Sequence, residues 1–159
     1  MRELAATFGE ALRKYQAAVE DFDRLVATVL GVNRTDARCL EILMFDFPDG
    51  ATPADLGAAL GLTSGSVTTM VDRLVRSHHV VRKAHPSDKR KVVVAPTDGA
   101  RQAAEAAYRP LVEQGAELLA RYSPAEIAAM IDFFTRASAL QQAEETALRA
   151  RHLLQLREL

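Results

Sequence analysis

The sequence predicts a mainly α-helical fold with one small β-hairpin, and three observations support this. Apolar residues recur at steps of three and four over much of the 159-residue chain. Two β-branched runs flank a Pro-Ser-Asp turn within VVRKAHPSDKRKVVVAP, residues 80–96. Two short helical segments joined by Gly-Leu-Thr precede that stretch. The composition, 48% hydrophobic and 26% charged, fits one domain or two small lobes that share a core.

The amino-terminal part is predicted to hold a long helix and a shorter one. The long helix ends at Gly31, since glycine readily adopts the left-handed conformation that closes a helix. The second helix runs from about Thr35 to Asp46, and Pro48-Asp49-Gly50 forms the turn after it. The apolar stripe of the long helix consists of Leu4, Phe8, Leu12, Tyr15, Val19, Phe22, Val26 and Val29.

Two short helices follow with the spacing of a helix-turn-helix. Thr52, followed directly by a proline, is placed to cap the third helix, and Gly61 ends it. Thr63 or Ser64 caps the fourth helix, which continues to about Ser77. In a helix-turn-helix the second helix enters the DNA major groove. If the fourth helix binds DNA in this way, one of its faces should be buried and the other should suit contact with DNA.

The fourth helix has one apolar face and one polar face. Small and hydroxyl side chains begin the polar face, and they let a helix backbone approach base edges and phosphates closely. An ordinary amphipathic helix capped by hydroxyl residues would show the same pattern. The face expected to be buried consists of Val67, Met70, Val71, Leu74 and Val75, and the outer face of Ser64, Gly65, Ser66, Thr68, Thr69, Asp72, Arg73 and Arg76.

The basic hairpin is expected to form the wing of a winged helix. Residues 80–83 and 91–95 are predicted to be antiparallel strands because β-branched residues favour strands. The valines would pack the hairpin onto the helices. Cations near the tip would then reach a phosphate backbone or a minor groove. The residues expected at or near the tip are Lys83, His85, Lys89, Arg90 and Lys91.

The carboxy-terminal part is predicted to form two more helices. The first covers residues 98–121 and contains Pro110, and the second opens with a capping box at residues 123–126. Their apolar surface exceeds what one small lobe can bury, so we expect a two-fold homodimer. The expected organisation is a helical dimerisation lobe of residues 1–34 and 98–159 and a winged helix-turn-helix lobe of residues 35–97.

Charge is concentrated in the middle of the chain, although the net charge is only −1. Residues 1–62 contain six Lys or Arg and ten Asp or Glu, giving −4. Residues 63–96 contain seven and two, giving +5, and residues 97–159 contain seven and nine, giving −2. A charged run is often a solvated face, but a localised basic segment is also typical of polyanion binding. Double-stranded DNA is the partner this pattern predicts.

Two stretches resemble the MarR family of bacterial transcription regulators: LGVNRTDARCLEIL and LTSGSVTTMVDRLVRSHHVVRKAHPSDKRKVVVAPTDGA. The resemblance extends from the first helix to about Leu140, and its sharpest part is the wing signature Asp-x-Arg, here Asp88-Lys89-Arg90. It implies that Arg90 enters the minor groove and that Asp88 helps to fix the tip. The DNA-contacting residues expected from the pattern and the resemblance are Ser64, Ser66, Thr68, Thr69, Arg73, His85, Asp88, Lys89, Arg90 and Lys91.

The resemblance also implies how such a regulator works. It suggests a repressor that binds an inverted-repeat operator as a homodimer and is released by a small aromatic or anionic effector. The effector pocket would be walled by the first, second and fifth helices. Six residues have suitable side chains, although each would suit a core or a surface equally well: Tyr15, Phe22, Arg34, Arg38, Phe45 and Tyr108.

The chain departs from the family pattern at His78. Such sequences usually have glycine after the recognition helix, where the backbone takes the left-handed conformation. Histidine enters that conformation only at a cost in free energy. We therefore expect a strained or differently shaped turn, which would affect the aim of the wing.

Other functions have weaker support. The sequence contains no phosphate-binding loop, dinucleotide fingerprint, nucleophile elbow or zinc-protease motif, so we expect no catalytic residues, no cofactor and no enzyme activity. His78, His79 and His85 lack the spacing and partners of a metal site. A winged helix that binds protein and not DNA is an alternative, which the basic wing disfavours.

A thiol-based redox regulator is a further alternative, because Cys39 lies beside Arg38, which would lower the pKa of the thiol. The plainer interpretation is a small residue on the edge of the second helix. A single cysteine also fits a reducing compartment. No stretch approaches the roughly 18 uncharged apolar residues of a membrane span, and charges near the start interrupt any signal peptide. We expect a cytoplasmic location and no membrane partner.

Overall fold

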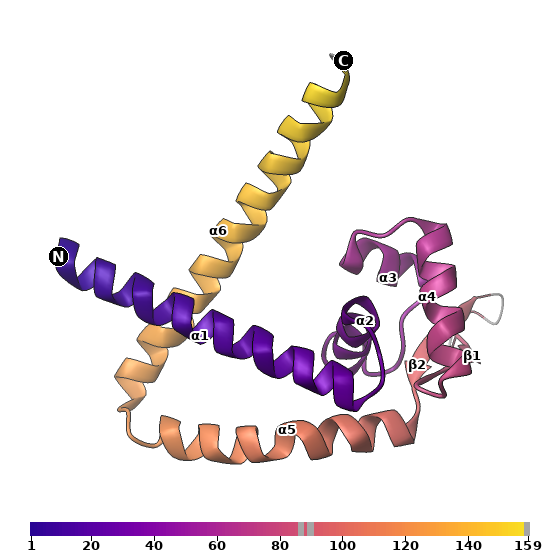
Figure 1. The fold of residues 1–159 in the computed structure, drawn as a ribbon, viewed down its shortest axis with the longest axis horizontal. Coiled ribbons are helices and arrows are strands. Elements are labelled where there is room, and N and C mark those ends of the chain that lie inside the picture. Colours follow the sequence, from indigo (N-terminus) through magenta and orange to yellow (C-terminus); the bar gives the residue numbers. More distant parts are fainter. Residues whose placement is uncertain (86–87, 89–90, 158–159) are drawn as a thin grey trace. The chain divides into compact units, whose positions relative to one another are not determined.

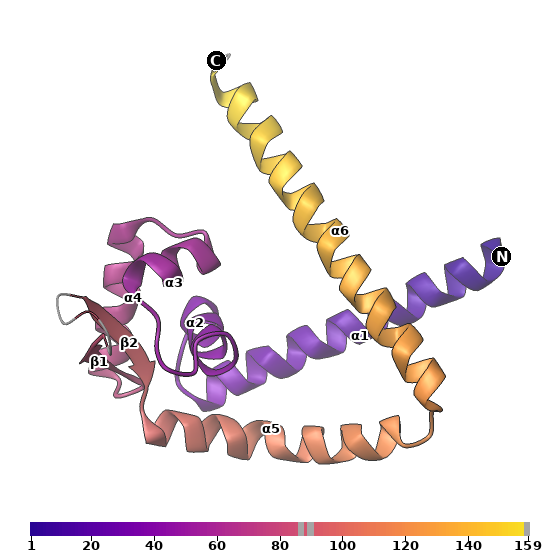
Figure 2. The ribbon, with the colours of Figure 1, turned by 180° about the vertical axis from the view of Figure 1, so that it is seen from behind.

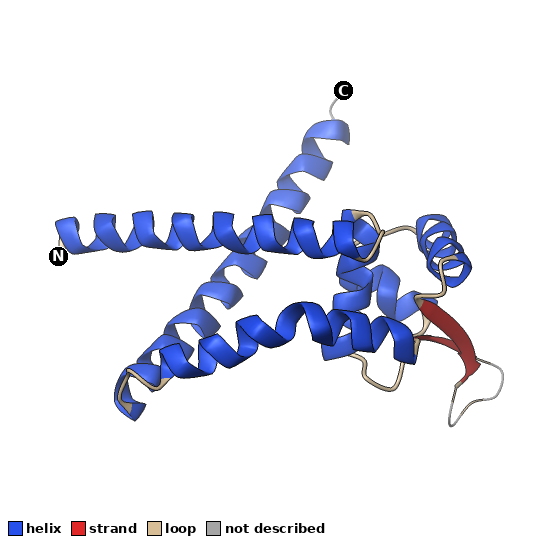
Figure 3. Ribbon diagram, turned by 60° about the horizontal axis from the view of Figure 1, so that its bottom comes forward, coloured by secondary structure: helices blue, strands red, loops and turns tan. Residues whose placement is uncertain are grey.

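The computed structural model describes residues 1–85, 88 and 91–157, with side chains as far as residue 152. The described part is mainly helical with one antiparallel hairpin, which confirms the predicted fold class (Figures 1 and 3). The elements are α1 (Arg2–Val29), α2 (Arg34–Phe45), α3 (Pro53–Leu60), α4 (Ser64–Arg76), β1 (Val80–Ala84), β2 (Val92–Pro96), α5 (Asp98–Leu119) and α6 (Pro124–Arg157).

The chain divides into two units within α5. The first unit, Met1–Arg109, contains α1 to α4, the hairpin and the first half of α5. The second unit, Pro110–Leu159, contains the rest of α5 and α6. The helical assignment of α5 is continuous through Pro110.

The helix boundaries follow the capping residues expected from the sequence. Gly31 closes α1 with φ +66° and Gly61 closes α3 with φ +64°. Thr52 and Asp55 form a full capping box, in which the Asp55 carboxylate accepts from the Thr52 backbone N–H at 2.9 Å. Ser123 and Glu126 form the corresponding pair at the start of α6. These hydrogen bonds satisfy backbone donors that the first helical turn leaves unpaired.

The hydrophobic core of the first unit lies among α2, α3, α4 and the hairpin, and the two opposite views show the hairpin beside α4 (Figures 1 and 2). The predicted buried face of α4 is confirmed, with four residues buried and Val75 packed against the same core. The core residues are Cys39, Leu40, Ile42, Leu43, Ala51, Leu56, Val67, Met70, Val71, Leu74, Val80 and Val94.

Backbone pairing fixes the hairpin to the helices. In the hairpin Val80 pairs with Pro96 and Ala84 with Val92. Ala51, in the loop before α3, exchanges two backbone hydrogen bonds with Val94, at 2.9 and 2.8 Å. The middle of β2 is therefore bonded to the segment that leads into the helix-turn-helix.

Candidate DNA-binding surface

The outer face of α4 begins at a hydroxyl cap. The Oγ1 atom of Thr63 accepts a hydrogen bond from the backbone N–H of Ser66 at 3.3 Å and lies 3.0 Å from the Ser66 hydroxyl. Thr63 and Ser66 are both exposed. The cap orients the Ser66 hydroxyl at the positive end of the helix, where the backbone N–H groups favour a phosphate.

The next turn of α4 presents two threonines and a glycine. The hydroxyls of Thr68 and Thr69 donate to the backbone carbonyls of Ser64 and Gly65, each at 3.0 Å. Their oxygen lone pairs remain able to accept a hydrogen bond from a base. A Cβ atom added at Gly65 would meet nothing within 4 Å. The packing of the chain itself therefore does not require glycine at this position.

A surface cleft of about 640 Å³ lies between the start of α2 and the outer face of α4. It combines backbone and hydroxyl groups with two cationic side chains, which are the groups that contact nucleic-acid backbones. Arg34, predicted as an effector residue, lies here beside predicted DNA-contacting residues. The cleft is lined by Asn33, Arg34, Thr35, Leu62, Gly65, Ser66, Thr69, Met70 and Arg73.

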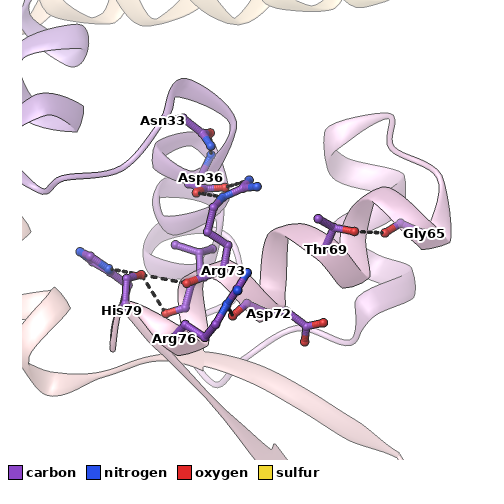
Figure 4. A network of polar contacts seen from close by, with 10 residues as sticks. Asn33, Asp36, Gly65, Thr69, Asp72, Arg73, Arg76 and His79 are labelled. Atoms are coloured by element: carbon purple, nitrogen blue, oxygen red, sulfur yellow. Dashed lines mark hydrogen bonds and ion pairs between the residues drawn. The ribbon is translucent and has the colours of Figure 1, made fainter.

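Arg73 is paired with a buried carboxylate on α2 (Figure 4). Its Nε donates to one oxygen of Asp36 and its Nη2 to the other, both at 2.6 Å. Asp36 is 2% exposed, whereas the Arg73 side chain is 42% exposed. The bond to Asp36 raises the pKa of Arg73 above its ordinary value, so the guanidinium stays charged. The edge of the guanidinium that carries Nε and Nη2 is therefore already bonded within the protein itself.

Asp36 was missed at the sequence level, although the sequence contains a signal for it. Its position precedes Cys39, Leu40 and Leu43 by three, four and seven residues, so it shares the buried face of α2. An acidic residue on a buried face requires a partner. The sequence does not identify that partner, because Arg73 lies 37 residues further along the chain.

The wing turn is closed by bonds that involve two of the predicted tip residues. The backbone N–H of Asp88 donates to Nδ1 of His85 at 3.2 Å, and the Asp88 carbonyl accepts from the N–H of Lys91 at 2.9 Å. Both bonds use backbone atoms of Asp88, so the tip-fixing role expected of this residue stays a prediction. Lys91 is exposed. Lys89 and Arg90 lie outside the described residues.

A second ion pair joins the wing to α4. Arg82 on β1 donates to Asp72 at 2.5 Å, and both side chains are about half exposed. The sequence placed Asp72 on the outer face and counted Arg82 only as part of the basic segment. Their pairing means that consecutive residues of α4, Asp72 and Arg73, hold the helix to the wing and to α2 respectively.

The turn after α4 has the conformation that glycine would adopt. His78 has a φ of +58°, and it is the only non-glycine residue with positive φ in the described part of the chain. The backbone N–H groups of His78 and His79 donate to the carbonyls of Val75 and Leu74, which is the usual closure of a helix by a left-handed residue. The turn therefore keeps the ordinary shape with a strained residue in it.

Two of the six predicted effector residues contact each other in the first unit, and the effector role of all six stays a prediction. Phe22 and Tyr108 contact edge to face, with ring centroids 5.3 Å apart, and the Tyr108 hydroxyl donates to Asp23 at 3.0 Å. Burial, reinforced by Asp23, raises the pKa of Tyr108 to about 12. Of the other four, Arg34 lines the cleft, Arg38 pairs with Glu41, and Tyr15 and Phe45 are 61% and 75% exposed.

The Cys39 thiol lies in the core and not on the edge of α2, so that part of the sequence interpretation was wrong. It is fully buried, and burial, with a smaller effect of Asp36, raises its pKa from 9.0 to about 12. Arg38 pairs with Glu41 at 2.7 Å. The environment is opposite to that of a reactive thiolate and gives no support to the redox alternative.

The described part of the chain shows neither a candidate metal site nor a membrane-spanning helix. No three His, Cys, Asp or Glu residues there are grouped so that they could hold a metal ion. Among the described helices, none has the length and apolarity needed to cross a membrane.

The helix-turn-helix, the exposed hydroxyl face of α4 and the attached basic hairpin define a winged-helix DNA-binding protein. Residues 30–91 match the model of the MarR family. An uncharacterized HTH-type transcriptional regulator of Bacillus subtilis, YcgE, is 32% identical over 89% of this chain and 91% of its own length. The chain belongs to the MarR family, whose members are transcriptional regulators and not enzymes.

Solved structures of low sequence identity share the fold. The S. aureus MepR–DNA complex has a TM-score of 0.59 at 19% identity and covers 82% of this chain and 97% of MepR. The transcriptional regulator Tm0710 from Thermotoga maritima has a TM-score of 0.60 at 18% identity and covers 89% and 98%.

Proposed function

We propose that this MarR-family regulator is a repressor that binds an inverted-repeat operator as a homodimer and is released by a small aromatic or anionic effector. The observation that carries the proposal is the outer face of α4. It presents exposed hydroxyls and an uncrowded glycine next to a basic hairpin. Such a face supports direct contact with base edges in the major groove.

Exposed apolar side chains support the homodimer and the lobe division proposed from the sequence. Within each unit taken separately, large apolar residues lie along α1, the second half of α5 and α6, where a soluble monomer would rarely expose so many. A second copy of the same helices is the simplest cover. The exposed residues are Leu4, Phe8, Tyr15, Val19, Leu25, Val29, Leu111, Val112, Leu118, Leu119, Ile131, Phe133, Phe134, Leu140 and Leu148.

The central experiment measures mass and DNA binding together. Light scattering of the purified protein is expected to give the mass of a dimer at micromolar concentration. A gel shift with DNA flanking its own gene is expected to locate an inverted repeat of roughly 16–20 base pairs, since paired recognition helices read half-sites about one helical turn apart. A monomer that binds no duplex even at low salt would favour the protein-binding alternative.

Effector release is tested separately with a matched pair of probes. Benzoate is aromatic and anionic, whereas benzamide has nearly the same shape without the charge. Release by a small aromatic anion predicts that benzoate weakens the gel shift and that benzamide does so less. Equal behaviour of the two, or no effect of either, would count against an effector of this class.

A further inference from the structure

The ion pair between Asp36 and Arg73 joins a buried carboxylate on α2 to a partly exposed guanidinium on α4. Asp36 is 2% exposed and both of its oxygens are engaged by one guanidinium. Its backbone N–H is bound in turn by the side chain of Asn33, the N-cap of α2, at 2.9 Å. Asp36 is therefore held at the start of α2 by its backbone N–H and bonded to α4 by its carboxylate.

The position of Arg73 would otherwise suit a DNA contact. Ser66, Thr69 and Arg73 follow one another at steps of three and four along α4, and all three line the cleft. However, the Nε and Nη2 groups of Arg73 donate to Asp36 (Figure 4). A side-on bidentate contact with guanine would need these same two N–H groups, so only the end-on pair of Nη1 and Nη2 could reach a base while the bond to Asp36 is intact.

We propose that Arg73 is a positioning residue: its bond to Asp36 sets how α4 sits against α2 and thereby determines the selectivity for operator over other DNA. The inference rests on the proposed DNA-binding function. Bidentate pairing fixes the angle between two groups as well as their distance. It holds the outer face of α4 in register with the start of α2, on the opposite side of the cleft.

The variants separate positioning from direct contact. Arg73→Lys keeps the positive charge but cannot form the planar two-point bond. Asp36→Asn keeps the shape but loses the charge of the partner, and Arg73→Gln with Asp36→Asn removes both charges. Arg76→Gln is the matched control, because Arg76 is an exposed cation one turn further along the same helix.

The measurement is the ratio of affinities for two duplexes at one salt concentration. One is the tightest-binding duplex that the wild-type protein selects from a random pool, and the other is a scrambled version of it. We expect Arg73→Lys and Asp36→Asn each to reduce this ratio by about tenfold, and the double variant to be no worse than either, since coupled residues are not additive. Arg76→Gln is expected to weaken both duplexes equally and to leave the ratio unchanged.

Two results would overturn the proposal. If Arg73 contacts DNA directly, Asp36→Asn, which frees the guanidinium, leaves the ratio at or above the wild-type value, whereas Arg73→Lys lowers it. If the pair serves stability alone, the melting temperature falls while the ratio measured well below it stays at the wild-type value. A wild-type protein that selects no duplex would instead refute the proposed function itself, so the two failures are distinguishable.

Discussion

At the scale of single residues, Cys39 shows how burial determines chemistry. The thiolate is the reactive form, and a pKa of about 12 leaves almost none of it at neutral pH. We expect Ellman's reagent to label the native protein at least about a hundredfold more slowly than the denatured protein. Cys39→Ala is the blank for this assay. Rapid labelling of the native protein would restore the redox alternative.

The same shift predicts how stability depends on pH. The pKa of Cys39 is higher in the folded state than its ordinary value of 9.0. Its contribution to the free energy of unfolding is therefore fully present below pH 9 and is lost as the pH rises toward 12. Urea unfolding of the wild type should lose stability faster than Cys39→Ala over this alkaline range. Parallel curves for the two proteins would contradict the shift.

His78 is expected to reduce the stability of the fold, because its side chain is strained in the left-handed conformation. Glycine at φ +58° avoids the strain that a side chain meets there. His78→Gly should therefore raise the free energy of unfolding by about 1 kcal/mol, or the melting temperature by roughly 2–4 °C. Gly61→Ala, at φ +64° after α3, is the reverse control and should destabilise. A destabilised His78→Gly would mean that the imidazole itself contributes a favourable contact.

At the scale of elements, features that depend on neighbouring residues could be predicted from the sequence, whereas contacts between distant residues could not. The cap Thr52 was predicted, and Thr63 was one of two candidates for the next cap, because each cap depends on residues within one turn. The pair of Asp36 with Arg73 was not evident, because it depends on how α2 packs against α4. The depth of Cys39 was misjudged for the same reason. Periodicity gives the face of a helix, but tertiary packing decides how completely that face is buried.

Helix α4, the proposed recognition helix, offers a test in which stability and DNA binding change in opposite directions. Gly65→Ala adds a methyl group that meets nothing in the protein, so the helix should be stabilised by about 0.5–1 kcal/mol. DNA binding should nevertheless weaken, since the methyl group would stand between the helix backbone and the groove. The measurements are thermal unfolding and fluorescence anisotropy with the selected duplex.

Gly115→Ala in α5 is the control for this test, because a Cβ atom there also meets nothing within 4 Å. It is expected to stabilise its helix and to leave DNA affinity unchanged, with light scattering used to check the mass. If Gly65→Ala binds DNA as well as the wild type, close approach of α4 through this residue is excluded.

At the scale of the whole molecule, the distribution of charge predicts the response to salt. Residues 63–96 carry +5, and the buried Asp36 neutralises Arg73, which leaves +4 in each protomer. A homodimer would therefore contact DNA with about eight effective charges. The logarithm of affinity should fall against the logarithm of the salt concentration with a slope of about −7, so that affinity falls about ten-thousandfold between 50 and 200 mM salt.

Removing one cation per protomer with Arg76→Gln should reduce the magnitude of this slope by about two. A slope near half the expected value would indicate that one protomer binds alone, and an affinity independent of salt would contradict a DNA-binding role for the basic segment.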